Sequence, residues 1–127
     1  MFENTKAFGS FSVSDRDKAE EFYGGVLGLD VSKTPQGLEL RIAGGNPIFI
    51  YQSSTNKPAD FTILNFPVDD IEKAVDELMA KGVHMEQYDM PGIKTDQKGI
   101  VRSDTGPRAM AWFKDPAGNI LSVMQEK

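Results

Sequence analysis

Hydrophobic residues change their spacing along the chain in an order that occurs twice. Apolar residues at every second position are typical of a strand with one buried face, and spacings of three and four residues are typical of an amphipathic helix. The first strand and helix cover Phe11–Val13 and Ala19–Leu27, and the second pair covers Leu64–Val68 and Ile71–Met79. We therefore expect each half of the chain to begin with a strand followed by a helix.

Residues typical of helix ends flank both helical segments. The sequences Ser14-x-x-Asp17 and Asp69-x-x-Glu72 predict that Ser14 and Asp69 cap the two helix starts with their side-chain oxygens. Gly28 and Gly82 follow the last apolar residues, at the position where a left-handed residue commonly ends a helix.

The two halves of the chain also resemble each other in sequence. Phe11–Asp15 aligns with Phe66–Asp70, and Gly45–Gln52 aligns with Gly118–Gln125, where the second half has a longer insertion between the two matches. Because both matches occur in the same order, we expect two copies of one supersecondary unit.

Three strand-like runs follow each expected helix. This order predicts an α+β fold, a mostly antiparallel sheet with the helices on one face. The polar segment 53–59 is expected to link the two copies within one domain, 1–127. The runs are Leu29–Lys33, Leu38–Ile42 and Pro47–Gln52 in the first copy, and Val83–Gln87, Arg108–Lys114 and Asn119–Gln125 in the second.

Alternation along the strands separates a core face from a second face. The core face would carry residues such as Val13, Ile50 and Leu121 under the helices. The second face mixes aromatic rings, small hydroxyls, an amide and charges, and we expect a cupped, partly apolar surface for a ligand or a partner subunit. In an alternative interpretation, the aromatic rings only pack on one another. This face would carry Phe8, Ser10, Phe49, Tyr51, Ile63, Asn65, Met110, Trp112, Ser122 and Met124, with Glu39 and Arg41.

Composition excludes several classes of chemistry. The chain has 127 residues, no cysteine, one histidine and a formal net charge of −5. Disulfides, thiolate metal sites, cysteine nucleophiles and metal sites with several histidines are therefore excluded within one chain. The negative charge without a basic cluster argues against nucleic acid as a partner. The sequence shows neither a basic start followed by an apolar stretch nor an apolar run long enough to cross a membrane, so we expect a cytoplasmic protein without a membrane partner.

Three segments resemble the vicinal oxygen chelate superfamily, which includes glyoxalase I, bleomycin-resistance proteins and extradiol dioxygenases. They are Val13–Tyr23 with Leu27-Gly-Leu29, Val68–Val75 with Gly82-Val83, and Phe113–Asn119. The run Tyr88–Gly99 before Ala111–Lys114 also resembles a bacterial subgroup without an assigned function. The resemblance implies two tandem βαβββ modules, about residues 5–53 and 60–127, which form a cupped, mixed sheet around a cavity with the helices outside. It also implies a homodimer.

The resemblance also assigns positions to metal ligands. Metalloenzymes of this family hold a divalent ion with His, Gln or Glu on the first and last strand of each module. The matching positions here are Phe8, Phe49, Ile63 and Ser122, and none of these residues is a competent ligand for such an ion. We therefore expect no metal and no other cofactor.

Other polar residues are candidates for chemistry or for ligand orientation. His84 and Glu86 are candidate catalytic residues, although a structural role suits an isolated histidine as well. The segment Gln87–Pro107 is long and rich in Gly, Asp and Lys, which is typical of a binding loop or lid. Arg108 and Arg41 are candidate anion ligands. Lys94, Lys98 and Arg102 either add donors near the cup or pair with Asp96 and Asp104.

These observations favour a metal-free protein that binds a small organic molecule through aromatic and apolar contacts. Two alternatives stay open. The first is a metal-dependent lyase, isomerase or dioxygenase with unusual ligands such as His84, Glu86 and Glu39. The second is a non-catalytic interaction module whose cup closes against another subunit.

Overall fold

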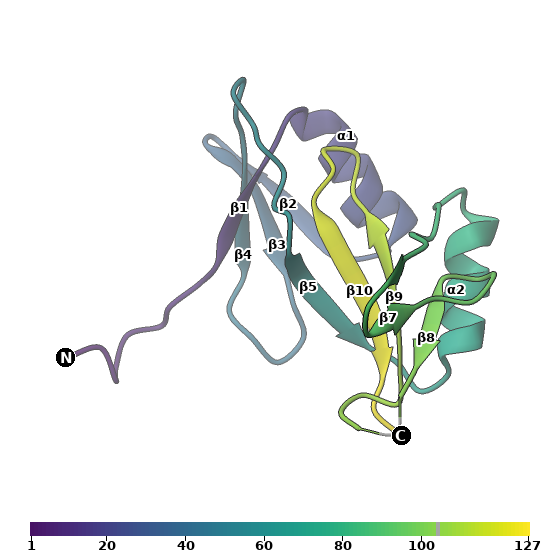
Figure 1. Ribbon diagram of the computed structural model, residues 1–127. Coiled ribbons are helices and arrows are strands. Elements are labelled where there is room, and N and C mark those ends of the chain that lie inside the picture. Colours follow the sequence, from purple (N-terminus) through teal and green to yellow (C-terminus); the bar gives the residue numbers. More distant parts are fainter. Residues whose placement is uncertain (104) are drawn as a thin grey trace. The chain divides into compact units, whose positions relative to one another are not determined.

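The computed structural model describes residues 1–103 and 105–127, which divide into two compact units, Met1–Pro58 and Ala59–Lys127. Figure 1 shows the elements in chain order. The first unit contains β1 (Ser10–Val13), α1 (Arg16–Glu20), the π-helix η1 (Glu21–Val26), β2 (Asp30–Thr34), β3 (Gly37–Arg41) and β4 (Ile48–Gln52). The second contains β5 (Thr62–Pro67), α2 (Ile71–Ala80), β6 (Asp89–Met90), β7 (Ile93–Lys94), β8 (Ile100–Arg102), β9 (Ala109–Lys114) and β10 (Ile120–Gln125).

Both units build a four-stranded sheet with the same topology. The strand orders are β1-β4-β3-β2 and β5-β10-β9-β8. In each sheet the first strand of the unit pairs in parallel with the last, and the other pairs are antiparallel. The expected α+β fold of two tandem modules with mixed, mostly antiparallel sheets is confirmed.

The strand registers repeat as the internal sequence match predicts. Ser10 of β1 is paired with Phe49 of β4, and Asn65 of β5 is paired with Ser122 of β10. The alignment of the two halves places Ser10 on Asn65 and Phe49 on Ser122, so the pair in one sheet is equivalent to the pair in the other. The two modules therefore match residue by residue along the strands that carry most of the candidate site.

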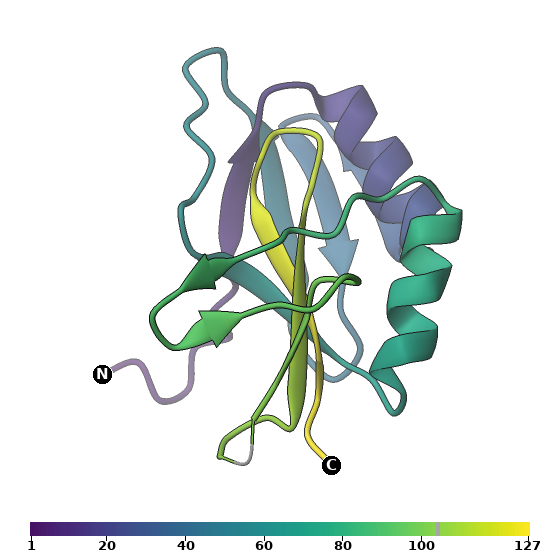
Figure 2. The ribbon, with the colours of Figure 1, turned by 45° about the vertical axis from the view of Figure 1, so that its right-hand side comes forward.

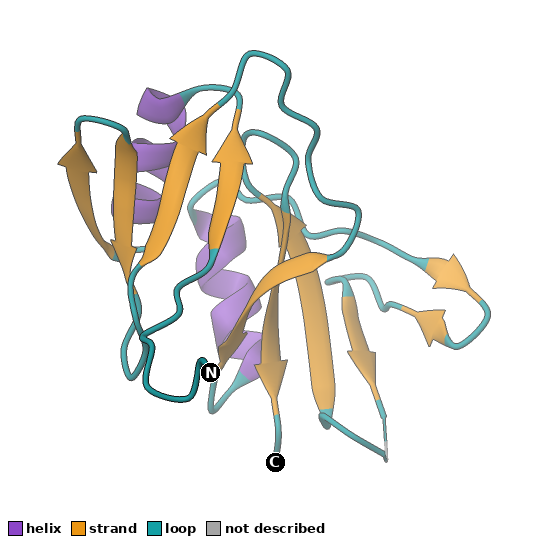
Figure 3. Cartoon of the chain, turned by 90° about the vertical axis from the view of Figure 1, so that its left-hand side faces the viewer, coloured by secondary structure: helices purple, strands orange, loops and turns teal. Residues whose placement is uncertain are grey.

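Each sheet is covered by helix on one face within its own unit (Figure 3). Helix α1 contacts β3 and β4, and α2 contacts β9 and β10. The covered faces are apolar and buried, which explains why the alternating residues form strands here. Buried residues include Val13, Tyr23, Leu38, Leu40 and Ile50 in the first unit, and Ile71, Val75, Phe113, Leu121 and Val123 in the second.

The residues that cap the helix starts lie one position later than predicted. Asp15 and Asp70, not Ser14 and Asp69, cap them: the Asp15 carboxylate accepts from the Asp17 and Lys18 N–H groups, and Asp70 accepts from Lys73. The physical reason is that Asp15 and Asp70 are the last residues with extended backbone before the helical turn.

The ends of the helices agree with the prediction. Gly28 and Gly82 have φ angles of 73° and 87°, in the left-handed region that only glycine adopts without strain. None of the helices in the described ranges is long and apolar enough to cross a membrane.

One predicted strand is wrong. Residues Val83–Gln87 form only a single bridge, between Met85 and Phe113 of β9, whereas β8 forms a regular ladder with Ala109–Ala111 of β9. β8 buries the side chain of Ile100, which is 2% exposed. In Val83–Gln87, by contrast, His84 is exposed. The segment Gln87–Pro107 therefore contains regular structure. It includes β8 and the β6–β7 hairpin, both green in Figure 2.

Candidate functional site

The face of each sheet opposite its own helix, called the helix-free face below, carries most of the candidate residues. In the first unit, the registers align Ser10, Phe49 and Glu39 across β1, β4 and β3. Tyr51, on the same strand as Phe49, is stacked on it with ring centroids 6.0 Å apart and an interplanar angle of 19°. Tyr51 is 40% exposed, so this aromatic pair offers a flat surface to a ligand.

A groove of about 610 Å³ lies beside this aromatic pair. Phe8, Pro47 and Phe49 supply apolar walls, and Glu39 and Asn46 supply polar groups. Phe8 precedes β1 and is 67% exposed, so it lies at the rim of the groove rather than within the sheet. The volume is in the range of small-molecule sites.

Arg41, an expected anion ligand, has partners on its own sheet. Its guanidinium donates to the Ser32 hydroxyl at 2.8 Å and lies 3.0 Å from the Glu39 carboxylate and 3.6 Å from the Asp30 carboxylate. Its charge is compensated by two carboxylates, so an anionic ligand would have to compete with them.

On the helix-free face of the second unit, Asn65, Ser122 and Trp112 form one row across β5, β10 and β9. The buried Ser122 hydroxyl donates to Asn65 Oδ1 at 2.5 Å. Met110 and Met124 are paired in the neighbouring row. Trp112 and both methionines are half-buried, so the face combines soft apolar groups with an exposed amide.

Ile63, also expected on this face, lies at an irregularity of the sheet. Thr62 and Leu64 of β5 are paired with the adjacent residues Ile120 and Leu121 of β10. Ile63 is therefore the extra residue of a β-bulge, which the alternation of the sequence does not reveal.

Tyr88 also belongs to this face, although the sequence pattern does not distinguish it from other aromatic residues. Its ring meets Trp112 edge-on, with centroids 5.5 Å apart and an interplanar angle of 73°. Burial raises the pKa of the Tyr88 phenol above its ordinary value; the negative charge of Glu86 raises it further, and Lys114 opposes this effect. The sequence feature that could have indicated Tyr88 is its place as an aromatic residue at the start of a long Gly- and Asp-rich segment.

Of the two candidate catalytic residues, His84 lines a groove apart from the row of Asn65, Ser122 and Trp112, whereas Glu86 is next to Trp112. His84 is exposed and lines a separate groove of about 330 Å³, between the end of α2 and the segment before β8. The Glu86 carboxylate lies 3.5 Å from Lys114 Nζ, and its backbone N–H donates to the Trp112 carbonyl at 2.8 Å. Within residues 1–103 and 105–127, no group of three or more His, Asp or Glu side chains could hold a metal ion.

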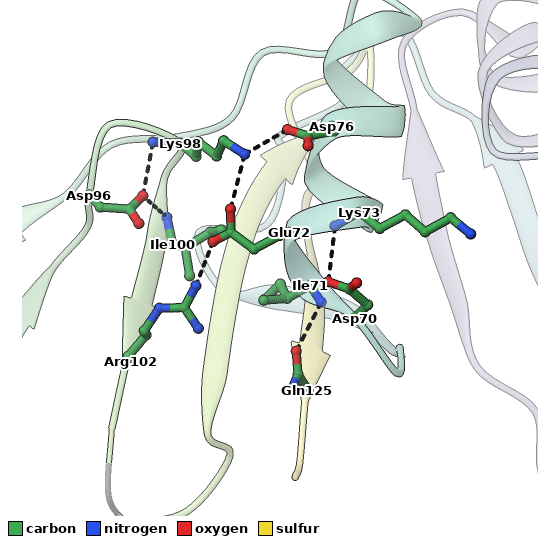
Figure 4. Close-up of polar contacts among 10 residues, drawn as sticks. All are labelled: Asp70, Ile71, Glu72, Lys73, Asp76, Asp96, Lys98, Ile100, Arg102 and Gln125. Carbon is green, nitrogen blue, oxygen red and sulfur yellow. Dashed lines mark hydrogen bonds and ion pairs between the residues drawn. The ribbon is translucent and has the colours of Figure 1, made fainter.

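Two basic residues of the segment Gln87–Pro107, Lys98 and Arg102, extend toward α2 (Figure 4). Lys98 Nζ lies 3.0 Å from Glu72 and 2.9 Å from Asp76, and Arg102 lies 2.5 Å from Glu72. Hydrogen bonds to Asp76 and Glu72 raise the pKa of Lys98 above its ordinary value.

The Lys98 and Arg102 side chains therefore pair with carboxylates of α2, and the expected pairing of the Lys98 side chain with Asp96 is wrong. Asp96 accepts from the backbone N–H groups of Lys98 and Ile100, which shapes the turn before β8. Asp104 lies outside the described residues. Arg108 is exposed and lines a polar groove with Arg102 and Glu126, and Lys94 is exposed on β7.

The four positions that the family resemblance assigns to metal ligands do not fit a metal ion. Phe8, Phe49 and Ile63 have no donor atom, and the Ser122 hydroxyl gives its proton to Asn65. A neutral hydroxyl in this role is a poor ligand for a divalent cation, and three apolar side chains cannot complete its coordination.

Comparison with known proteins supports the same fold. A family model described as Glyoxalase/Bleomycin resistance protein/Dioxygenase superfamily matches residues 8–123. TnmS3, an antibiotic binding protein from Streptomyces sp. CB03234, is 24% identical with a TM-score of 0.68, covering 98% of each chain. A glyoxalase family protein from Enterococcus faecalis is 22% identical with a TM-score of 0.70, covering 98% of this chain and 99% of that one.

The fosfomycin resistance protein FosX from Listeria monocytogenes is 14% identical with a TM-score of 0.71, covering 95% of this chain and 92% of that one. Comparison with curated proteins finds no match. At these identities the similar structures show a shared fold, and the family match extends over nearly the whole chain. The chain therefore belongs to the glyoxalase/bleomycin resistance protein/dioxygenase superfamily.

Proposed function

We propose that the protein binds small planar organic molecules on the helix-free face of each sheet, without a metal ion and without converting them chemically. The main support is that aromatic and apolar side chains, Phe8, Phe49 and Ile63, stand at positions where metalloenzymes of the family carry metal ligands. Phe8 and Phe49 line the groove of the first unit, where a family metalloenzyme would carry metal ligands.

Two aromatic pairs supply the binding energy in this proposal. The Phe49–Tyr51 pair and the Tyr88–Trp112 pair each present ring surface near exposed or half-buried positions. Stacking on such pairs contributes affinity beyond the burial of area and suits a flat ligand. TnmS3 has the same fold and is described as an antibiotic binding protein, which supports small-molecule binding by analogy.

The test is a binding screen with the purified protein and a panel of planar aromatic compounds, followed by isothermal titration calorimetry. Phe49→Leu and Trp112→Leu should weaken binding of a ligand at least tenfold. Phe2→Leu, a change at a residue that is 74% exposed outside the sheets, is the matched control and should leave affinity unchanged. Equal affinity in all variants would contradict the proposal.

Metal analysis of the same preparation separates binding from metal-dependent catalysis. We expect a divalent metal content far below one ion per chain, and no change of ligand affinity after chelation. A stoichiometric ion that a chelator removes together with ligand binding would refute metal-free binding and favour an enzyme of the same superfamily.

We further propose a homodimer, which the family resemblance implies. Light scattering after size-exclusion chromatography should give twice the mass of the 14.0 kDa chain. A monomer at micromolar concentration would contradict this part of the proposal and would leave ligand binding unaffected.

A further inference from the structure

Ser122 is a polar residue in the interior of β10, and its hydroxyl determines how a neighbouring amide is oriented. The residue is 0% exposed, and its hydroxyl donates to Asn65 Oδ1 at 2.5 Å. A buried hydroxyl that fails to donate its proton destabilises the fold, so this bond is favoured over the flipped amide, in which Ser122 could only accept. The Asn65 oxygen is thereby committed to Ser122.

The orientation of Asn65 follows from this bond. An asparagine amide has one oxygen and one nitrogen, and the nitrogen carries two N–H donors. With Oδ1 held by Ser122, Nδ2 is the part of the exposed Asn65 side chain directed away from Ser122. We infer that Asn65 is a preoriented hydrogen-bond donor that selects planar ligands with a carbonyl-type acceptor at their edge. This inference rests on the proposed function and specifies the ligand class.

The surroundings of Asn65 suit such a ligand. Asn65, Ser122 and Trp112 lie in one row on three neighbouring strands, which places Asn65 and Trp112 about 10 Å apart at ordinary strand spacing. A ligand of two or three fused rings that lies on Trp112 can therefore reach Asn65 with its edge. Tyr88 contacts Trp112 edge-on and limits the orientation of the ring that stacks there.

The other module shows that the fold does not require this pair. The positions equivalent to Asn65 and Ser122 are Ser10 and Phe49, which are also paired in register. The same sheet topology forms with a phenyl ring in place of the buried hydroxyl. The Ser122–Asn65 bond is therefore a local feature of the second face and is free to serve ligand selection.

The test uses two cationic probes that differ by one carbonyl group: 2-trimethylammonio-9-fluorenone and 2-trimethylammoniofluorene. The trimethylammonium group has no hydrogen-bond donor or acceptor, so any difference in affinity reports the carbonyl. Calorimetric titration of the wild type should show at least tenfold tighter binding of the fluorenone. Asn65→Asp removes both N–H donors at nearly constant size and should abolish the preference. The new negative charge attracts both cationic probes alike, so the ratio of their two affinities is the readout.

Ser122→Ala is the second variant, because it frees the amide to rotate and should reduce the preference without removing Asn65. Asn4→Asp makes the same chemical change at an exposed residue and should keep the preference. Equal binding of both probes by the wild type, or an intact preference in Asn65→Asp, would overturn the inference and leave the proposed function standing. Binding of neither probe would overturn both.

Discussion

Removal of the Asp115 carboxylate should cost more stability than any single surface change in the molecule. Asp115 is 4% exposed and lies in the turn that joins β9 to β10. Its Oδ1 accepts from the backbone N–H groups of Ala117 and Asn119 at 2.9 Å each, and its Oδ2 accepts from Asn119 Nδ2 at 3.0 Å. This hairpin carries both Trp112 and Ser122, so the turn supports the proposed binding face.

The size of the effect follows from these three hydrogen bonds. A hydrogen bond to a charged group contributes about 1.5 kcal/mol at the lower end of the measured range. Three such bonds give about 4.5 kcal/mol, and water replaces part of this loss in a turn near the surface. We therefore expect Asp115→Ala to lower the free energy of unfolding by about 3–4 kcal/mol. Asp115→Asn keeps one acceptor oxygen and should cost about half as much.

Urea denaturation followed by Trp112 fluorescence measures this change, because Trp112 is the only tryptophan and lies on β9. Asp60→Ala, at an exposed aspartate of the same unit, is the control and should stay within about 0.5 kcal/mol of the wild type. A loss below about 1 kcal/mol for Asp115→Ala would show that water replaces the carboxylate and that the summation of bonds is wrong.

Three further changes test other parts of the structure. Gly37→Ala would place a Cβ 2.2 Å from the Ile50 carbonyl oxygen and should destabilise the protein by about 3 kcal/mol in the same assay. A spectroscopic pH titration should show one tyrosine that ionises above the ordinary value of 10.0, and Tyr88→Phe should remove it. Since the folded protein holds this proton more tightly than the unfolded chain, stability should fall as the pH rises above 10.0. Glu72→Gln removes ion pairs with Lys98 and Arg102 and should speed hydrogen exchange of the β8 amides.

Matched controls distinguish these effects from general damage. Gly25→Ala adds a methyl group with no atom within 4 Å and should be nearly neutral. Glu77→Gln makes the Glu72 change at an exposed position of the same helix and should leave β8 exchange unchanged. Equal destabilisation by both alanines, a high-pH tyrosine that survives Tyr88→Phe, or equal exchange in both glutamine variants would contradict the respective prediction.

Most of the fold could be predicted because its signals are local or repeated. Alternation defined the strands, the two glycines marked the helix ends, and the internal repeat reproduced the register of Ser10 with Phe49 and of Asn65 with Ser122. The error at Val83–Gln87 had a tertiary cause. This segment and Ile100–Arg102 both contain apolar residues that suit an edge strand, and only packing beside β9 decides which forms a ladder and which a single bridge.

The candidate site was predictable where it depended on the period of the strands and not where it depended on the path of a long segment. Alternation predicts that Phe49, Trp112 and Ser122 lie on the helix-free faces, and the strand registers agree with this. The contact of Tyr88 with Trp112 and the bond of Ser122 with Asn65 each join segments that are far apart in the sequence. Neither has a local sequence signal, because both follow from how separate strands and turns are brought together.

The two modules share a structural support and differ on their helix-free faces. The Gln52 side chain accepts from the Arg16 N–H at 2.7 Å, and the Gln125 side chain accepts from the Ile71 N–H at 2.9 Å. In both modules the last strand thus satisfies an N–H group at the first residue of the helix, which has no partner within the helix itself.

The equivalent positions Phe49 and Ser122, earlier on the same strands, have opposite chemistry. Residues that position the helices are thus alike in the two copies, whereas residues at these two positions of the helix-free faces are not. Both faces therefore offer aromatic surface, and the second adds a directed hydrogen bond, so we expect ligand selectivity to depend more on Asn65 than on any residue of the first module.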